Sequence, residues 1–114
     1  MSHERFQNCI DECNSCATMC NHCAVSCLHE DDAKTMATCI ELDMQCAAIC
    51  RAAAEMMSLG SQYAVQLCAL CAQVCDACGM ECGRHNVQHC QDCAEACRNC
   101  AIACREMSLQ NATV

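Results

Sequence analysis

The cysteines of this chain recur at alternating gaps of three and four residues, and this spacing restricts the fold more than any other feature of the sequence. The run from Cys9 to Cys27 reads CIDECNSCATMCNHCAVSC and contains neither proline nor glycine. Positions three and four residues apart share one face of an α-helix, whereas a half-buried strand would repeat every second residue. The run therefore predicts a helix that carries thiols along one face.

Four such faces contain all 19 cysteines of the 114-residue chain. On the second face, Met36 and Met57 occupy positions of the same three-and-four spacing as the cysteines, and Asp43 stands where a thiol is expected. Short polar segments at 29–32, 58–61 and 83–86 separate the faces, and Gly60 and Gly83 are expected to end the helices before them.

Four helical faces with no strand pattern between them predict an all-α fold. The connections between the faces are short, and short connections make neighbouring helices antiparallel. We expect an antiparallel up-down four-helix bundle with a Cys-lined core, forming a single domain over residues 1–114.

Charge and composition exclude several classes of protein. The net charge of −8 disfavours nucleic-acid binding, which needs a basic face, and no run approaches the ~20 apolar residues of a membrane span. The start of the chain, MSHERFQNC, lacks the apolar core of a secretory signal, and the cysteine count is odd. We therefore expect a reducing, cytoplasmic location in which the thiols stay free.

A core made of thiols is best explained by metal. Cysteine buries less apolar surface than leucine, so packing alone is a poor reason for it, and disulfides are unusual in a reducing compartment. Soft thiolates select Cu(I), Zn(II) or iron–sulfur clusters. A Cu(I) ion that replaces one thiol proton leaves the charge of the core unchanged, whereas Zn(II) with four thiolates leaves a buried charge of −2.

Multiple Cu(I) ions are thus the expected cargo of a protein that is not an enzyme. A zinc or cadmium buffer of metallothionein type, and a thiol redox or iron–sulfur protein, remain as alternatives. The predicted thiolate ligands are Cys9, Cys13, Cys16, Cys20, Cys23, Cys27, Cys39, Cys46, Cys50, Cys68, Cys71, Cys75, Cys78, Cys82, Cys90, Cys93, Cys97, Cys100 and Cys104.

The two ends of the predicted bundle differ. One end gathers the polar segments at 29–32 and 83–86, where His85 and His89 are candidate first ligands for incoming metal. Asp43 is expected either to ligate metal weakly or to hold a thiol or a histidine by a hydrogen bond. His3, His22 and His29 are expected at the surface. The other end is predicted to be closed by an apolar plug of Phe6, Met57, Ala64 and Met107.

The chain resembles the bacterial four-helix-bundle copper storage proteins, in the branch without a signal peptide. The resemblance covers nearly the whole chain and rests on the four cysteine faces and on stretches such as CIELDMQCAAIC, CALCAQVCDACGMECG and HCQDCAEACRNCAIAC. It implies cytosolic storage and detoxification of many Cu(I) ions inside the bundle, and a homotetramer of bundles. It also implies that all 19 cysteines are ligands, with Asp43 and His89 near the mouth of the bundle. Apolar residues on the flanks of the cysteine faces could serve contacts between bundles, but packing within one bundle explains them equally well. These residues are Leu42, Ile49, Leu67, Leu70 and Val74.

Overall fold

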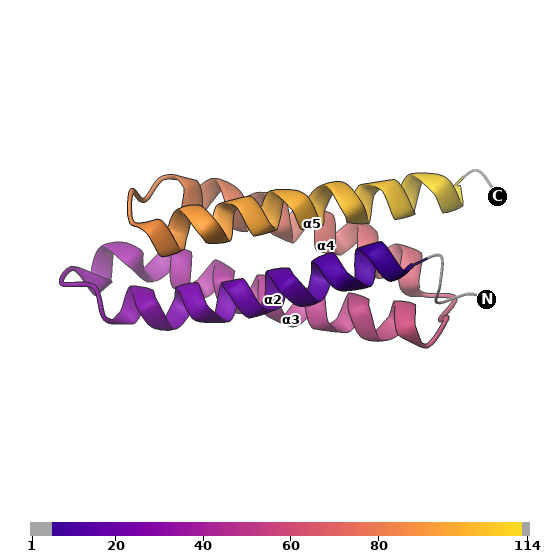
Figure 1. Cartoon of the computed structure of the whole chain (residues 1–114), viewed down its shortest axis with the longest axis horizontal. Coiled ribbons are helices and arrows are strands. Elements are labelled where there is room, and N and C mark those ends of the chain that lie inside the picture. Colours follow the sequence, from indigo (N-terminus) through magenta and orange to yellow (C-terminus); the bar gives the residue numbers. More distant parts are fainter. Residues whose placement is uncertain (1–5, 113–114) are drawn as a thin grey trace.

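The computed structural model describes residues 6–112, and over these residues it is a bundle of four α-helices without a strand. The helices are α2 (Gln7–Leu28), α3 (Ala37–Ser58), α4 (Ala64–Gly83) and α5 (Gln88–Ala112), and a short 3-10 helix, η1 (Ala33–Met36), precedes α3. Successive helices run in opposite directions (Figure 1). The predicted fold class, an antiparallel up-down four-helix bundle, is confirmed.

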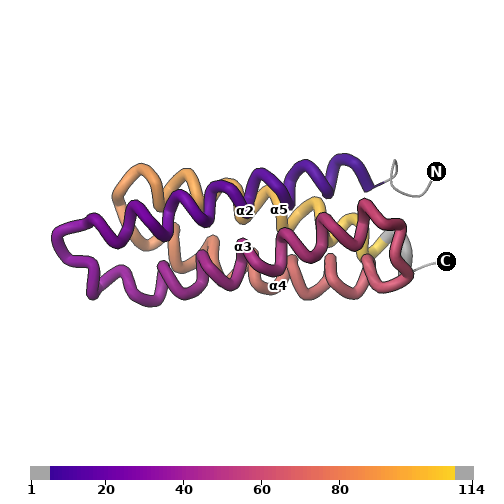
Figure 2. Tube along the Cα trace, turned by 90° about the horizontal axis from the view of Figure 1, so that it is seen from below, coloured from indigo at the N-terminus to yellow at the C-terminus, as the bar shows by residue number. Residues whose placement is uncertain are grey.

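The bundle is a rod of 49 × 20 × 17 Å in which α2 packs against α3 and α5, and α4 packs against the same two helices. The start of α2 and the end of α5 lie at one end of the rod, together with the α3–α4 connection (Figure 2). The opposite end is formed by residues 29–36 and 84–87, and we call it the mouth. Over residues 6–112, no helix is apolar over a long enough stretch to cross a membrane.

The two glycines expected to end helices behave differently. Gly60 has a φ of 68°, its N–H donates to the carbonyl of Met57 at 3.1 Å, and the N–H of Ser61 donates to Met56 at 3.0 Å. This pair of bonds is a Schellman motif, in which the left-handed residue favours glycine. Gly83 does stand at the end of α4, as its last residue, but the prediction that it acts as a glycine C-cap is wrong, because the C-cap is Arg84 with a right-handed φ of −75°. There the chain leaves the helix through two tighter bonds, Arg84 to Glu81 and His85 to Cys82.

Cysteine and alanine occupy the interior of the bundle. All 19 cysteines are buried, and the alanines beside them allow the helices to approach closely. At Gly79, a Cβ atom would lie 3.3 Å from the Cβ of Cys97, so α4 and α5 are tightly packed at that level. Of the flank residues, Leu42, Ile49, Leu67 and Val74 pack partly buried against the core, whereas Leu70 is exposed.

Candidate metal centre

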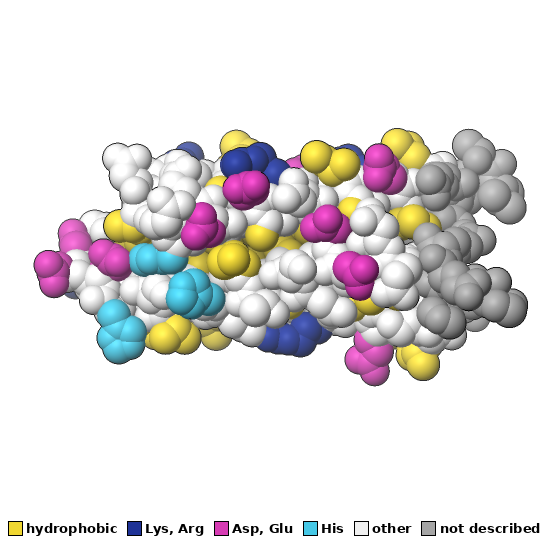
Figure 3. Space-filling model, in the orientation of Figure 1, with side chains coloured by type: hydrophobic (Ala, Val, Ile, Leu, Met, Phe, Trp, Pro, Cys, Tyr) yellow, Lys and Arg dark blue, Asp and Glu magenta, His cyan; other side chains and the backbone are white. Residues whose placement is uncertain are grey.

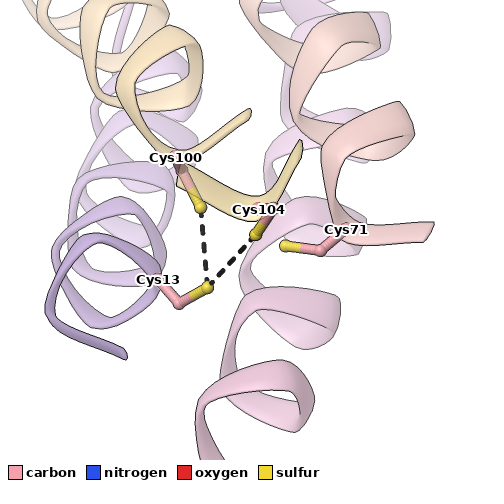
Figure 4. Close-up of side chains that lie close together, drawn as sticks. All are labelled: Cys13, Cys71, Cys100 and Cys104. Carbon is pink, nitrogen blue, oxygen red and sulfur yellow. Dashed lines mark hydrogen bonds between the residues drawn. The ribbon is translucent and has the colours of Figure 1, made fainter. Parts of the chain in front are cut away.

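The sulfur atoms of the 19 cysteines form a continuous column along the bundle axis. Every one of these cysteines is free, and their side chains turn inward from all four helices. Near the plug, the Sγ of Cys13 on α2 lies 3.6 Å from that of Cys100 and 3.7 Å from that of Cys104, both on α5 (Figure 4). At mid-height, Cys46 on α3 and Cys75 on α4 bring their sulfurs within 3.6 Å. The sulfur column thus joins thiols from helices that are far apart in sequence.

Groups of four sulfurs within the column lie close enough to share metal ions. In one group, Cys13, Cys71, Cys100 and Cys104 place all four Sγ atoms within 4.8 Å of one another (Figure 4). Three sulfurs around a trigonal ion with bonds of about 2.3 Å are about 4 Å apart, so such spacings need little rearrangement. Cys16 and Cys46 each belong to at least two such groups, which suits sulfurs that bridge neighbouring ions.

Two thiols at the mouth, those of Cys27 and Cys90, are held in their protonated form when no metal is bound. Desolvation raises the pKa of Cys27 to about 11, and it is the largest cause of the raised pKa of Cys90. Since the thiolate is the metal ligand, an ion that binds here must displace protons. Metal uptake is therefore coupled to proton release.

Asp43 is fully buried inside the sulfur column. Its Oδ1 accepts hydrogen bonds from the thiols of Cys78 at 3.2 Å, Cys82 at 3.3 Å and Cys93 at 3.3 Å, and its Oδ2 accepts one from Cys39 at 3.8 Å. Burial, followed by the neighbouring Cys93, raises the pKa of this carboxyl to about 8. Asp43 thus ties α3 to α4 and α5 through thiol hydrogen bonds, one of the two roles expected for it.

The two candidate histidines are placed differently. His89 Nε2 lies 3.5 Å from the Sγ of Cys27 and 3.9 Å from a carboxylate oxygen of Glu30, so it links the sulfur column to the mouth. His85 Nε2 instead lies 3.0 Å from the carboxylate of Glu81, at the rim. Histidine and acidic side chains gather together at the mouth end of the surface (Figure 3).

Of the other histidines, the two that the structure describes lie away from the sulfur column. His22 and His29 are exposed, as expected, and His3 lies outside the described residues.

Two features of the site were missed by the sequence analysis. The acidic partners of the histidines were not singled out, although Glu81 stands four residues before His85, a spacing that places both on one helix face. Glu30 comes from a different segment, and no sequence signal pairs it with His89. At the other end, the predicted plug residues are all buried, and the thiol of Cys68 also donates to Met57 Sδ at 3.5 Å, so a thioether extends the sulfur column.

Similar proteins carry the same architecture. The chain is 47% identical over 75 residues to the uncharacterized cysteine-rich protein YhjQ of Bacillus subtilis (strain 168), a match over 66% of this chain and 69% of that protein. The structure superposes on the Cu(I)-bound copper storage protein BsCsp3 of B. subtilis with a TM-score of 0.87 and 46% identity, covering 90% of this chain and 97% of that one.

A second solved structure and a family model agree with this. The copper storage protein Ccsp of Streptomyces lividans, loaded with 10 copper equivalents, gives a TM-score of 0.89 and 42% identity, over 93% of this chain and 85% of that one. The model of the family described as "Copper storage protein" (Csp) matches residues 2–109. This chain belongs to the copper storage protein family.

Proposed function

We propose that this protein stores Cu(I), taking many ions into the sulfur column and keeping them harmless in the cell. The observation that carries the proposal is the column itself: 19 free, buried thiols at sulfur–sulfur spacings that let one ion bind several sulfurs. The matched family model and the copper-loaded relatives support copper as the cargo.

Charge favours Cu(I) throughout the interior. Each Cu(I) ion that replaces a thiol proton adds no net charge, so a long buried column can fill while staying close to neutral. Cu(I) also accepts two or three sulfur ligands, and the α-helical i,i+4 pairs supply neighbours such as Cys46 and Cys50, whose sulfurs are 3.9 Å apart. The 19 cysteines are thus the proposed ligands.

The mouth is the proposed entrance. His89 contacts Cys27, the cysteine nearest the end of α2, and can pass an ion from solvent to the first thiols. His85 lies further out and is proposed as an outer, exchangeable ligand. Asp43 is proposed to act on the ions that reach its level, through the thiols that donate to it or as a weak ligand.

The proposal extends to the cellular setting. A Streptomyces lividans relative described as a cytosolic copper storage protein supports a cytoplasmic location. A homotetramer of bundles, and the absence of catalytic activity, are also part of the proposal. The exposed Leu70 is then a candidate for contacts between bundles.

Anaerobic titration of the reduced protein with Cu(I), in the presence of a competing chromophoric chelator, tests the function. Storage predicts that the protein takes up on the order of ten or more ions per chain before the chelator loads, and that the product is colourless. A brown, visibly absorbing protein would instead indicate iron–sulfur carriage. Saturation at one or two Cu(I) ions would refute storage.

A further inference from the structure

The sulfurs nearest the mouth form a group that differs from the deeper ones in its surroundings. Cys23 and Cys27 on α2, Cys39 on α3 and Cys90 on α5 have their four Sγ atoms within 4.8 Å of one another. We call them the mouth quartet. All four side chains are fully buried, yet Cys27, Cys39 and Cys90 lie within three residues of a helix end.

The spacing within the mouth quartet is that of a tetrahedral metal site. The Sγ atoms of Cys23 and Cys27 are 3.8 Å apart, those of Cys23 and Cys90 are 3.8 Å apart, and those of Cys27 and Cys90 are 3.7 Å apart. A tetrahedral ion with metal–sulfur bonds of about 2.3 Å separates its ligand sulfurs by about 3.8 Å. Cys39 on α3 is the fourth member: its Sγ lies within 4.8 Å of the other three sulfurs, and it also lies 3.2 Å from the Sγ of Cys82 and 3.8 Å from Asp43 Oδ2, contacts that it would exchange for the ion.

Geometry alone does not single out the mouth quartet, because deeper groups are spaced at least as well. In the group of Cys16, Cys20, Cys46 and Cys97, for example, the Sγ atoms of Cys16 and Cys97 are 3.8 Å apart. Charge separates the two cases. A dication held by four thiolates leaves a net charge of −2, which is costly inside the bundle unless other groups offset it.

The deep group lies at mid-helix, where the described side-chain contacts of its sulfurs are all to other sulfurs. At the mouth, by contrast, the negative charge has partners. Cys39 and Cys90 are each the third residue of their helix, where the positive end of the helix dipole favours a thiolate. Cys27 lies in the last turn of α2, where the dipole is unfavourable, and there His89 Nε2 approaches its sulfur to 3.5 Å. In the tautomer that carries its proton on Nε2, His89 donates a hydrogen bond to this sulfur, and such an outer contact stabilises and orients a thiolate ligand.

We propose that the mouth quartet, Cys23, Cys27, Cys39 and Cys90, is a tetrathiolate site for one Zn(II) ion, while the deeper column takes Cu(I). This inference goes beyond the proposed copper function and uses thiols of the same column. As the ion binds, four zinc–sulfur bonds form and the four thiol protons leave for solvent. The acidic residues Glu30, Asp31 and Asp32 beside the mouth raise the local concentration of dications. Because soft thiolates also select Cu(I), a zinc ion here holds the entrance until copper displaces it.

The test uses Co(II), whose tetrathiolate complexes absorb strongly in the red, as a spectroscopic probe for the zinc site. The reduced, metal-free protein is titrated anaerobically with Co(II), and Zn(II) is then added. We expect tetrathiolate bands that saturate at one Co(II) per chain and vanish when one equivalent of Zn(II) is added. Absence of these bands, or saturation at three or more ions per chain, would overturn the proposal.

A matched pair of cysteine variants and one histidine variant locate the site. Cys90→Ser should weaken Co(II) binding at least about tenfold, since it removes one of four ligands. Cys71→Ser, a deep cysteine outside the mouth quartet, should leave Co(II) affinity unchanged within about twofold. His89→Ala should weaken binding about tenfold without changing the number of sulfur ligands, as a positioning contact does. Equal losses in Cys71→Ser and Cys90→Ser would contradict the placement.

Measuring Cu(I) capacity on the same preparations keeps the two proposals distinguishable. High Cu(I) capacity without a Co(II) tetrathiolate spectrum would sink the zinc site alone. Low Cu(I) capacity would sink the storage function, whatever the Co(II) result.

Discussion

Replacing Asp43 with asparagine tests the consequences of burying a carboxyl among thiols. The side chain is fully buried, and burial raises its pKa from 3.8 to about 8. In the unfolded chain the carboxyl is ionised above about pH 4, whereas in the folded protein it stays protonated up to about pH 8. Between these values the folded state binds one more proton than the unfolded state. The contribution of Asp43 to the free energy of unfolding is therefore fully present below about pH 4 and is lost as the pH rises towards 8.

The expected size of the effect follows from the slope. When the folded state binds one more proton than the unfolded state, the free energy of unfolding falls by about 1.4 kcal/mol for each unit of increasing pH. From about pH 5 to about pH 7, the native protein should therefore lose about 3 kcal/mol through Asp43, a loss that Asp43→Asn lacks. The amide is nearly the same size as the carboxyl and can keep accepting thiol hydrogen bonds through its oxygen.

The assay is chemical denaturation of the metal-free, reduced proteins at both pH values. All other titrating groups are common to the two proteins, so the change in their stability difference isolates residue 43. Similar denaturant dependence and similar far-UV circular dichroism serve as the control for an intact fold. Parallel stability curves for the two proteins would show that Asp43 is ionised in the folded state, and that reasoning would then fail.

Three further predictions concern the ends of the bundle. His89→Ala should slow Cu(I) loading in stopped-flow measurements more than His85→Ala does, with capacity nearly unchanged in both, because only His89 contacts a thiol; a capacity that fell by half would mean that copper enters elsewhere. Gly60→Ala should lower the free energy of unfolding by about 1 kcal/mol, since its φ of 68° is strained for a side chain; an unchanged midpoint of denaturation would contradict this. Met57→Ala should cost about 2–5 kcal/mol in the metal-free protein, because a fully buried side chain leaves a cavity, and Met44→Ala, at an exposed position, is the control with little expected change.

The fold was predictable because the cysteine spacing has only one regular solution. Gaps of three and four residues fix a helix, and four faces with short connections fix an antiparallel bundle. The position of Asp43 on a cysteine face also predicted that it would point inward. Gly83 was mistaken for a left-handed C-cap like Gly60, because glycine at the end of a helical pattern is compatible with both a right-handed and a left-handed backbone.

The details of the mouth were beyond the sequence. His85 and His89 stand four residues apart in the chain, and nothing in their spacing tells which contacts sulfur. The difference arises because His89 is within α5, which faces Cys27 of α2, whereas His85 leaves α4 one turn after Glu81 and pairs with it. Likewise, the three thiols that donate to Asp43 Oδ1 come from α4 and α5, and their convergence depends on how the helices cross.

The central claim is that the interior sulfurs themselves hold the stored copper, and diffraction from Cu(I)-loaded crystals at the copper absorption edge tests it most directly. The account predicts a row of anomalous peaks along the bundle axis, each bonded to cysteine sulfurs from at least two helices. Copper confined to surface histidines, with the sulfur column free of metal in fully loaded protein, would contradict it.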